Sequence, residues 1–134
     1  MPDLNNVAAI GISVSSTCLC AATLDNSRNP VEKFEQAIES DSTVIDQIGS
    51  LVAKLSASSG VPVCVAVPGM IDSRSRRIVN SRISDFRDVD LSNSMSMPGL
   101  IVENDANAAA YADGSRRRSY GHWIVLADFA ANET

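Results

Sequence analysis

One apolar run constrains the fold of this chain most strongly, namely residues 61–67, Val-Pro-Val-Cys-Val-Ala-Val. A strand built from these residues is apolar on both of its faces, so both faces need cover. Sheets of this kind are flanked on each side by helices, and they are typical of α/β proteins. The run therefore predicts an α/β fold with this segment as a fully buried strand.

The N-terminal region predicts three antiparallel strands. Residues 7–14 and 17–24 are two mostly apolar, β-compatible runs, and the polar pair Ser15-Ser16 between them indicates a hairpin. Residues 25–30 are dense in turn formers and should lead into a third strand over 31–38. A mixed sheet that opens with three antiparallel strands is the expected result.

A helix should follow, because apolar residues recur at helical spacing after residue 43. Asp41 or Ser42 can cap its N-terminus, and Gly60 stands where it would end. The apolar face comprises Val44, Ile45, Ile48, Leu51, Val52 and Leu55.

Shorter elements are expected beyond the buried strand. Short strands are predicted around 78–79 and at 100–102, with a short or irregular piece over 91–97. An alanine-rich helix should run over 105–113 and end at Gly114, and a further strand is predicted over 122–127.

Bulk composition limits the classes of function. With 134 residues, 45% of them hydrophobic and 20% charged, the chain has the profile of one ordinary globular domain. No apolar run approaches the ~20 residues of a membrane span, and the first residues lack the features of a signal peptide, so we expect a cytoplasmic protein. The net charge of −5 argues against binding to nucleic acid or to anionic lipid.

The cysteines predict free thiols rather than a metal site. Cys18, Cys20 and Cys64 form an odd set without metal-ligand spacing, although Cys18 and Cys20 would share one face of a strand. Zinc would need more ligands than these, and His122 is the only histidine. We therefore expect no zinc and no other metal.

An adjacent amide and carboxylate, Asn104 and Asp105, open the small-residue segment 106–110. Asn104 can donate and accept hydrogen bonds, and an ionised Asp105 only accepts, which suits the orientation of a hydroxylated substrate. Asp105 could also act as a general base toward one of its hydroxyls. The alternative is that the pair simply caps a helix.

Three motifs carry a resemblance to a known family. They are residues 10–17 (Ile-Gly-Ile-Ser-Val-Ser-Ser-Thr), residues 67–72 (Val-Pro-Gly-Met-Ile-Asp) and residues 103–110 (Glu-Asn-Asp-Ala-Asn-Ala-Ala-Ala). In this order and spacing they resemble the N-terminal lobe of the ROK family, which joins sugar kinases and sugar-responsive repressors. The resemblance implies an actin-like (ribonuclease H-like) lobe over 7–121, after an extension over 1–6. Residues 122–134 would begin a second lobe that is truncated or absent.

The resemblance also assigns roles to particular residues. Asp105 matches the catalytic base, Asn104 the residue that holds sugar hydroxyls, and Gly69 a glycine that lets the backbone approach the sugar, although a plain turn glycine is the alternative. Ser81 and Arg82 fall at further sugar contacts, but the usual Pro-Asn-Leu pattern is missing there.

The first hairpin departs from the family pattern. The phosphate loop normally contains Asp-x-Gly-Gly-Thr, whereas this chain has Ser13, Ser15 and Ser16 at the aspartate and glycine positions and keeps only Thr17. The family implies ATP and Mg²⁺, and these replacements should weaken both phosphate approach and metal binding.

Three hypotheses about function follow. The first is a sugar kinase homologue that would transfer phosphate from ATP to a hexose-type sugar, with weak or no turnover by this lobe alone. The second is the sugar-sensing domain, or a remnant, of a ROK-type transcriptional regulator without catalysis; a truncated product without independent function is a third. A sugar is the expected ligand, and a second copy or a second lobe the expected protein partner. The arginine groups at 74–77 and 116–118 should form solvated surface.

Overall fold

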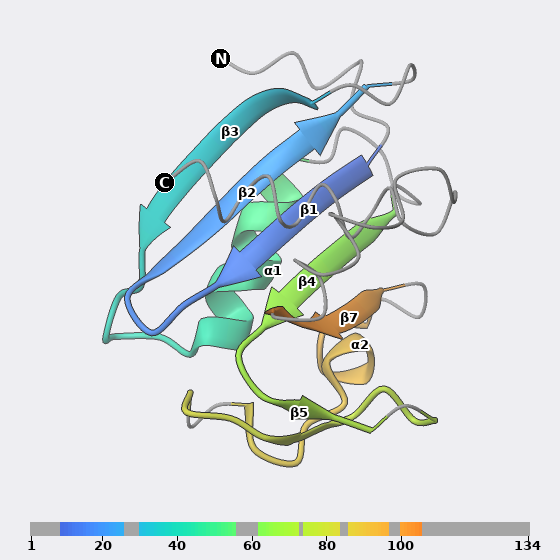
Figure 1. Cartoon of the computed structure of the whole chain (residues 1–134). Helices are drawn as coiled ribbons and strands as arrows, with labels where there is room; N and C mark the ends of the chain where they lie inside the picture. Colours follow the sequence, from blue (N-terminus) through green and yellow to red (C-terminus); the bar gives the residue numbers. More distant parts are fainter. Residues whose placement is uncertain are drawn as a thin grey trace.

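The computed structural model describes residues 9–25, 30–55, 62–72, 74–83, 86–96 and 100–105. Within this part of the chain, a five-stranded sheet has the order β3-β2-β1-β4-β7 (Figure 1). Strand β1 is antiparallel to β2, as β2 is to β3, whereas β1, β4 and β7 run parallel to one another. The predicted α/β class and mixed sheet are confirmed. The bounds are β1 Ala9–Val14, β2 Cys18–Leu24, β3 Pro30–Ala37, β4 Val63–Val67 and β7 Ile101–Asn104.

Strand β4 is the buried centre that its composition predicts. All five of its residues are buried, and it lies between β1 and β7. The carbonyl of Pro62 just before it accepts a hydrogen bond from the amide of Ile10 at 2.9 Å. The strand has hydrogen-bonding partners on both edges, so its backbone groups are satisfied away from water.

Helix α1, Val44–Leu55, covers one face of the sheet and lies behind it in Figure 1. Its apolar face packs into the core with residues such as Ile12, Leu19 and Val65. The N-terminal cap is Thr43 rather than Asp41 or Ser42, since the Thr43 hydroxyl accepts the amide N–H of Asp46 at 3.1 Å. The sequence offered three consecutive cap-forming residues, and the path from β3 into the helix selects the last of them.

Strand β5, Met70–Ile71, was not anticipated from the sequence. It pairs with β6, Ile78–Asn80, in a two-stranded sheet at one end of the molecule (Figure 1). The turn between them is held by Asp72, whose carboxylate accepts the amide N–H groups of Arg74 at 2.8 Å and Ser75 at 3.1 Å. These bonds lower the pKa of Asp72 and hold the turn in its observed conformation.

The predicted short piece after residue 90 is confirmed as helix α2, Leu91–Ser94. Asp90 caps it by accepting the amide N–H of Asn93 at 3.2 Å. Phe86 and Leu91 are fully buried in the main core, so they anchor this region to the sheet.

Several expected features lie outside the described residues. They are the extension over 1–6, the body of the helix predicted over 105–113 with Gly114, the arginines at 116–118, and residues 122–134 with their predicted strand and His122. Among the helices that the structure does describe, none has the length and apolar character needed to cross a membrane.

Candidate functional site

The candidate site lies at one edge of the main sheet. Because β1, β4 and β7 are parallel, the segments that leave their carboxyl ends meet at the same edge. Val67 pairs with Asn104, so the Pro68-Gly69 turn after β4 lies beside the end of β7. Ligands of open α/β sheets typically bind at such an edge.

A pocket of about 490 Å³ opens at this edge. It brings together four of the predicted site residues, Gly69, Ser81, Arg82 and Asp105. Asp105 directly follows β7 and is exposed. The remaining lining residues, which the sequence did not single out, are Pro68, Met70, Asn80 and Arg87.

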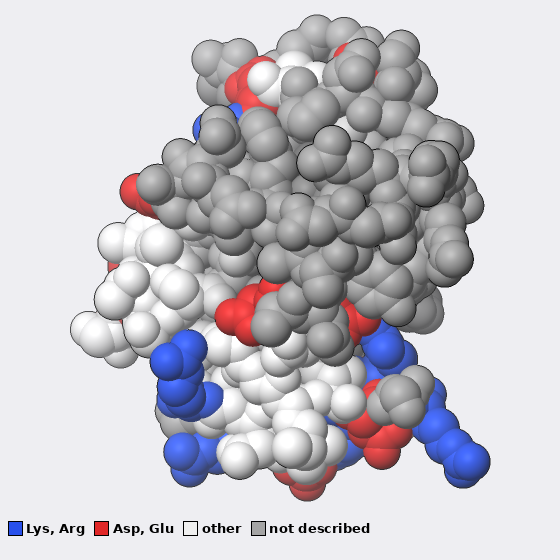
Figure 2. All heavy atoms as spheres, viewed as in Figure 1, with Lys and Arg blue, Asp and Glu red and all other residues white. Residues whose placement is uncertain are grey.

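The pocket thus has a carboxylate and two guanidinium groups in its wall. Arg82 and Arg87 are both exposed, and Figure 2 shows Lys and Arg side chains gathered around the end of the molecule that carries β5. Arg87 was missed because it stands 18 positions before Asp105, in a segment without a motif. Opposite charges around one opening can orient a polar ligand through several hydrogen bonds.

Asn104 does not line the pocket itself, but the next residue, Asp105, does. The side-chain amide of this half-buried residue donates to the carbonyl of Gly69 at 2.6 Å. Its backbone amide donates to the Glu103 carboxylate at 2.9 Å. Asn104 therefore connects the end of β7 to the turn after β4 and fixes the geometry of the pocket wall.

Gly69 is required by packing, whatever the ligand. A Cβ added there would fall against the backbone oxygen of Asn80 and within 3.0 Å of the Ser81 Cβ. Backbone atoms cannot yield as a flexible side chain can, so an alanine at this position would displace the turn or strand β6. The close contact observed at this glycine is with the backbone of β6, which supports its interpretation as a turn glycine; its role toward a sugar stays a prediction.

Ser81 lines the pocket, but its hydroxyl is engaged with the backbone. It donates to the carbonyl of Pro68 and accepts the amide N–H of Ile83 at 3.1 Å. The residue is only 6% exposed. Its observed contacts hold the segment after β6 against the Pro-Gly turn.

An ion pair between Arg76 and Glu103 lies at the same edge. Glu103 is 7% exposed, and its carboxylate lies 3.3 Å from a guanidinium nitrogen of Arg76. That nitrogen also donates to the carbonyl of Val102. The expectation that the 74–77 arginines form solvated surface applies only in part to Arg76: its side chain is 38% exposed, but its guanidinium is the cationic partner that the buried carboxylate requires. Arg77, by contrast, pairs with Asp88 at 2.7 Å on the surface.

The serine loop, Ser15, Ser16 and Thr17, follows β1 at the same sheet edge but is not among the residues that line the pocket. The Ser15 hydroxyl accepts the amide N–H groups of Thr17 at 3.2 Å and Cys18 at 3.0 Å, and it donates to the Cys18 carbonyl at 3.2 Å. Two backbone donors of this turn are thus already used within the hairpin.

Comparison with known proteins decides the family. The sequence profile of the ROK family matches residues 8–127. The chain belongs to the ROK family. Among curated proteins, no significant match was found.

Solved structures of ROK proteins share the fold of this lobe. A ROK glucokinase from Streptomyces griseus, in complex with glucose and AMPPNP, is 26% identical with a TM-score of 0.65, covering 78% of this chain and 35% of its own. A polyphosphate/ATP-glucomannokinase from Arthrobacter is 26% identical with a TM-score of 0.62, covering 81% and 48%.

A more distant relative supports the fold alone. The ROK hexokinase from Thermus thermophilus is 21% identical with a TM-score of 0.60, covering 78% of this chain and 37% of its own. This chain thus spans between about a third and a half of the length of these three kinases. The fold is that of the actin-like ROK sugar kinases.

Proposed function

We propose that this chain forms the sugar-binding lobe of a ROK sugar kinase homologue, with little or no kinase turnover by itself. The proposal is carried by one observation, the pocket that joins the Pro-Gly turn after β4, Ser81 and Arg82 after β6, and Asp105 after β7. Its volume of about 490 Å³ lies in the range of small-molecule sites. The glucose bound to the Streptomyces griseus glucokinase supports a hexose-type sugar as the ligand class.

In this proposal Asp105 is the general base. Its exposed carboxylate stands at the pocket wall, where it can accept a hydrogen bond from a sugar hydroxyl and take its proton as that oxygen becomes a nucleophile. Arg82 is proposed to donate to other sugar oxygens, and Asn104 to position the Gly69 carbonyl beside them. Mg²⁺-dependent phosphoryl transfer from ATP to a sugar hydroxyl is the reaction that membership of this family suggests for a complete protein.

A sugar panel tests the proposal directly. Thermal stabilisation of the full 134-residue chain should appear with at least one hexose or hexosamine and be absent with a non-sugar polyol of similar size. Asp105→Asn should weaken the stabilisation, because it removes an anionic acceptor from the pocket wall. Asp88→Asn is the matched control, since Asp88 is an exposed aspartate whose contact with Arg77 lies outside the pocket. Stabilisation by no sugar, or equal weakening by both variants, would refute a sugar site here.

The serine loop favours a second candidate, a sugar-sensing domain of a ROK-type regulator. Two amide donors of this turn are taken by the Ser15 hydroxyl, and Ser13 stands where ROK kinases have a carboxylate. A domain of this kind would bind sugar and shift between conformations without chemistry.

Activity measurements separate the two candidates. ADP release over the sugar panel should be measured for this chain and for a variant that restores the family loop, Ser13→Asp with Ser15→Gly and Ser16→Gly. Sugar-dependent ADP release that rises in the restored variant and is lost in Asp105→Asn supports a kinase. Sugar-dependent stabilisation without ADP release in either protein supports a sensor.

A further inference from the structure

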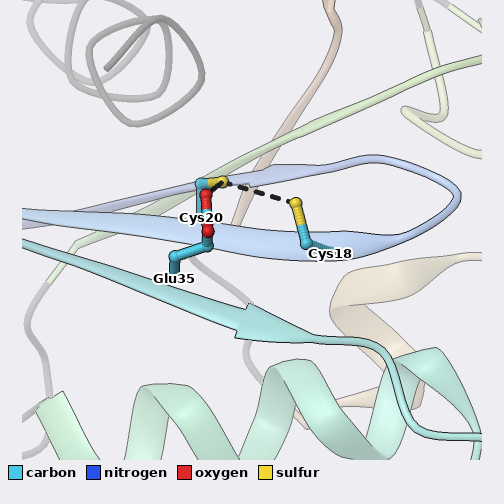
Figure 3. Close-up of side chains that lie close together, drawn as sticks. All are labelled: Cys18, Cys20 and Glu35. Carbon is cyan, nitrogen blue, oxygen red and sulfur yellow. Dashed lines mark hydrogen bonds between the residues drawn. The ribbon is translucent and has the colours of Figure 1, made fainter. Parts of the chain in front are cut away.

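We propose that Cys18, Cys20 and Glu35 form a binding site for a thiophilic divalent cation, with Zn²⁺ as the representative ion. The three side chains come from adjacent strands: both cysteines lie on β2, and Glu35 lies on β3, where it is the registered partner of Cys20. Figure 3 shows the two sulfurs and the carboxylate converging on one side of the sheet. This cluster is separate from the sugar pocket.

Strand geometry explains why the three groups meet. Side chains two positions apart point to the same face of a strand, which places Cys18 and Cys20 side by side. Antiparallel pairing then sets Glu35 directly across from Cys20 on that face. The Sγ atoms are 3.7 Å apart, and the Cys20 Sγ lies 3.8 Å from a Glu35 carboxylate oxygen.

These separations match those around a tetrahedral zinc ion. Two sulfurs that are each about 2.3 Å from tetrahedral Zn²⁺ lie about 3.8 Å apart, and a sulfur and a carboxylate oxygen lie about 3.6 Å apart. One candidate ligand atom from each of Cys18, Cys20 and Glu35 falls within 4.8 Å of the other two. Little movement is therefore needed to place all three around one ion, with a fourth position left for water.

Exposure and charge also suit a cation. Cys20 is 4% exposed, Cys18 is half-buried and Glu35 is exposed, so the cluster is open on one side. The Glu35 carboxylate lies beside the Cys20 sulfur and brings negative charge to the cluster. When a divalent cation binds, each thiol exchanges its S–H bond for an S–metal bond, and the proton leaves to solvent.

The site would act on the serine loop. The Ser15 hydroxyl lies 3.6 Å from the Cys18 sulfur and accepts the Cys18 amide N–H. Metal binding at Cys18 would therefore hold the end of the β1–β2 hairpin in place, including the turn amides that donate to the Ser15 hydroxyl.

A zinc titration tests the site. The reduced full-length chain should bind one Zn²⁺ against a chromophoric competitor and release two protons, one from each thiol. Co²⁺ in place of Zn²⁺ should give sulfur-to-cobalt charge-transfer absorption. Cys18→Ser and Cys20→Ser should each weaken binding at least about 100-fold, and Glu35→Gln about tenfold, because each removes one ligand.

Matched controls make the outcome decisive. Cys64→Ala removes the third thiol, which is buried on β4, and Glu39→Gln removes an exposed glutamate outside the cluster. Both should bind Zn²⁺ as the parent chain does. The proposal would be overturned if the parent chain failed to compete for zinc, or if Cys18→Ser and Glu35→Gln bound Zn²⁺ as tightly as the parent chain. Neither Cys18 nor Glu35 is fully buried, so both variants should fold, and circular dichroism checks that they do.

Discussion

Single residues at the pocket edge work mainly through the backbone. Asn104 donates to the Gly69 carbonyl, and Ser81 donates to the Pro68 carbonyl, so two side chains hold the same turn. A misplaced turn would move every group in the pocket wall. At this scale, the site depends on precise positions of main-chain oxygens as well as on its charged side chains.

Gly69→Ala should destabilise the chain and abolish sugar-dependent stabilisation, because the new Cβ would meet the Asn80 backbone oxygen. A cost of about 1–3 kcal/mol is expected from overpacking of this kind. Gly49→Ala is the matched control: nothing lies within 4 Å of a Cβ at that position in α1, so it should stabilise the helix by up to about 1 kcal/mol. Urea unfolding of both variants measures the difference, and equal effects would contradict the steric explanation.

Cys64 should make the chain less stable in alkali. Burial raises the pKa of its thiol from the ordinary value of 9.0 to about 12. The folded state therefore holds this proton more tightly than the unfolded state. The contribution of the protonated thiol to the free energy of unfolding is complete below pH 9.0 and is lost as the pH rises toward 12. At pH 10.5 the loss should approach about 2 kcal/mol.

Thermal unfolding between pH 8 and 10.5 checks this expectation. The decline in Tm should be shallower in Cys64→Ala than in the parent chain, whatever the packing cost of the substitution at pH 8. Parallel pH profiles for the two proteins would show that the thiol does not titrate between the folded and unfolded states.

At the scale of elements, the connection from β3 into α1 is tightly specified. The buried side chain of Gln47 donates to the carbonyls of Glu39 at 2.9 Å and Ser42 at 3.1 Å, and it accepts the Glu39 amide at 2.9 Å. A buried amide is tolerated because its donors and its acceptor are all satisfied. Together with the Thr43 cap, this network sets where the helix begins.

Thr43→Ala should cost about 1 kcal/mol, because the amide N–H of Asp46 loses its acceptor at the helix N-terminus. Ser42→Ala and Asp41→Ala remove exposed side chains that the sequence offered as alternative caps. Both should change the free energy of unfolding by less than about 0.5 kcal/mol. Chemical denaturation of the three variants identifies the cap. If either control lost more stability than Thr43→Ala, the cap would be assigned to that residue instead.

At the scale of the whole molecule, one continuous core joins α1, the main sheet and the segment between β4 and β7 that carries much of the pocket. Ile48, Val65 and Phe86 come from these three regions and belong to the same buried cluster. The pocket wall is therefore anchored on the core that holds the sheet together.

Ile48→Ala should destabilise the chain by about 2–5 kcal/mol, since this residue is fully buried in the core. Ile45→Ala, in the same helix and only partly buried, should cost about half of that or less. Because the core is shared, Ile48→Ala should lower the unfolding midpoint equally when helix and sheet signals are followed by circular dichroism. Separate transitions would show that α1 and the sheet unfold independently.

Comparable costs for the two isoleucine variants would contradict the observed burial. The comparison is sharp because the two side chains are chemically identical and only three positions apart. Their exposure differs because the helix turns Ile48 toward the sheet and leaves Ile45 at the margin of the interface.

Local patterns in the sequence were enough to place the larger elements. The unbroken apolar run of β4, the polar break at Ser15-Ser16 and the helical spacing after residue 43 each reflect how one segment meets the core. Such signals lie within a few residues of one another, so they survive in the sequence alone. The ROK motifs added the chain order of the site residues, and four of these line one pocket.

Tertiary structure decided the contacts between distant segments. The Asn104 bond to Gly69 spans 35 positions, the Arg76–Glu103 pair spans 27, and the Cys20–Glu35 contact spans 15. Each depends on strand pairing and register, which a linear pattern of residue types does not contain. For the same reason the sequence indicated neither strand β5 nor the ion pair of Arg76 with Glu103, and it left Glu35 apart from the two cysteines that it faces.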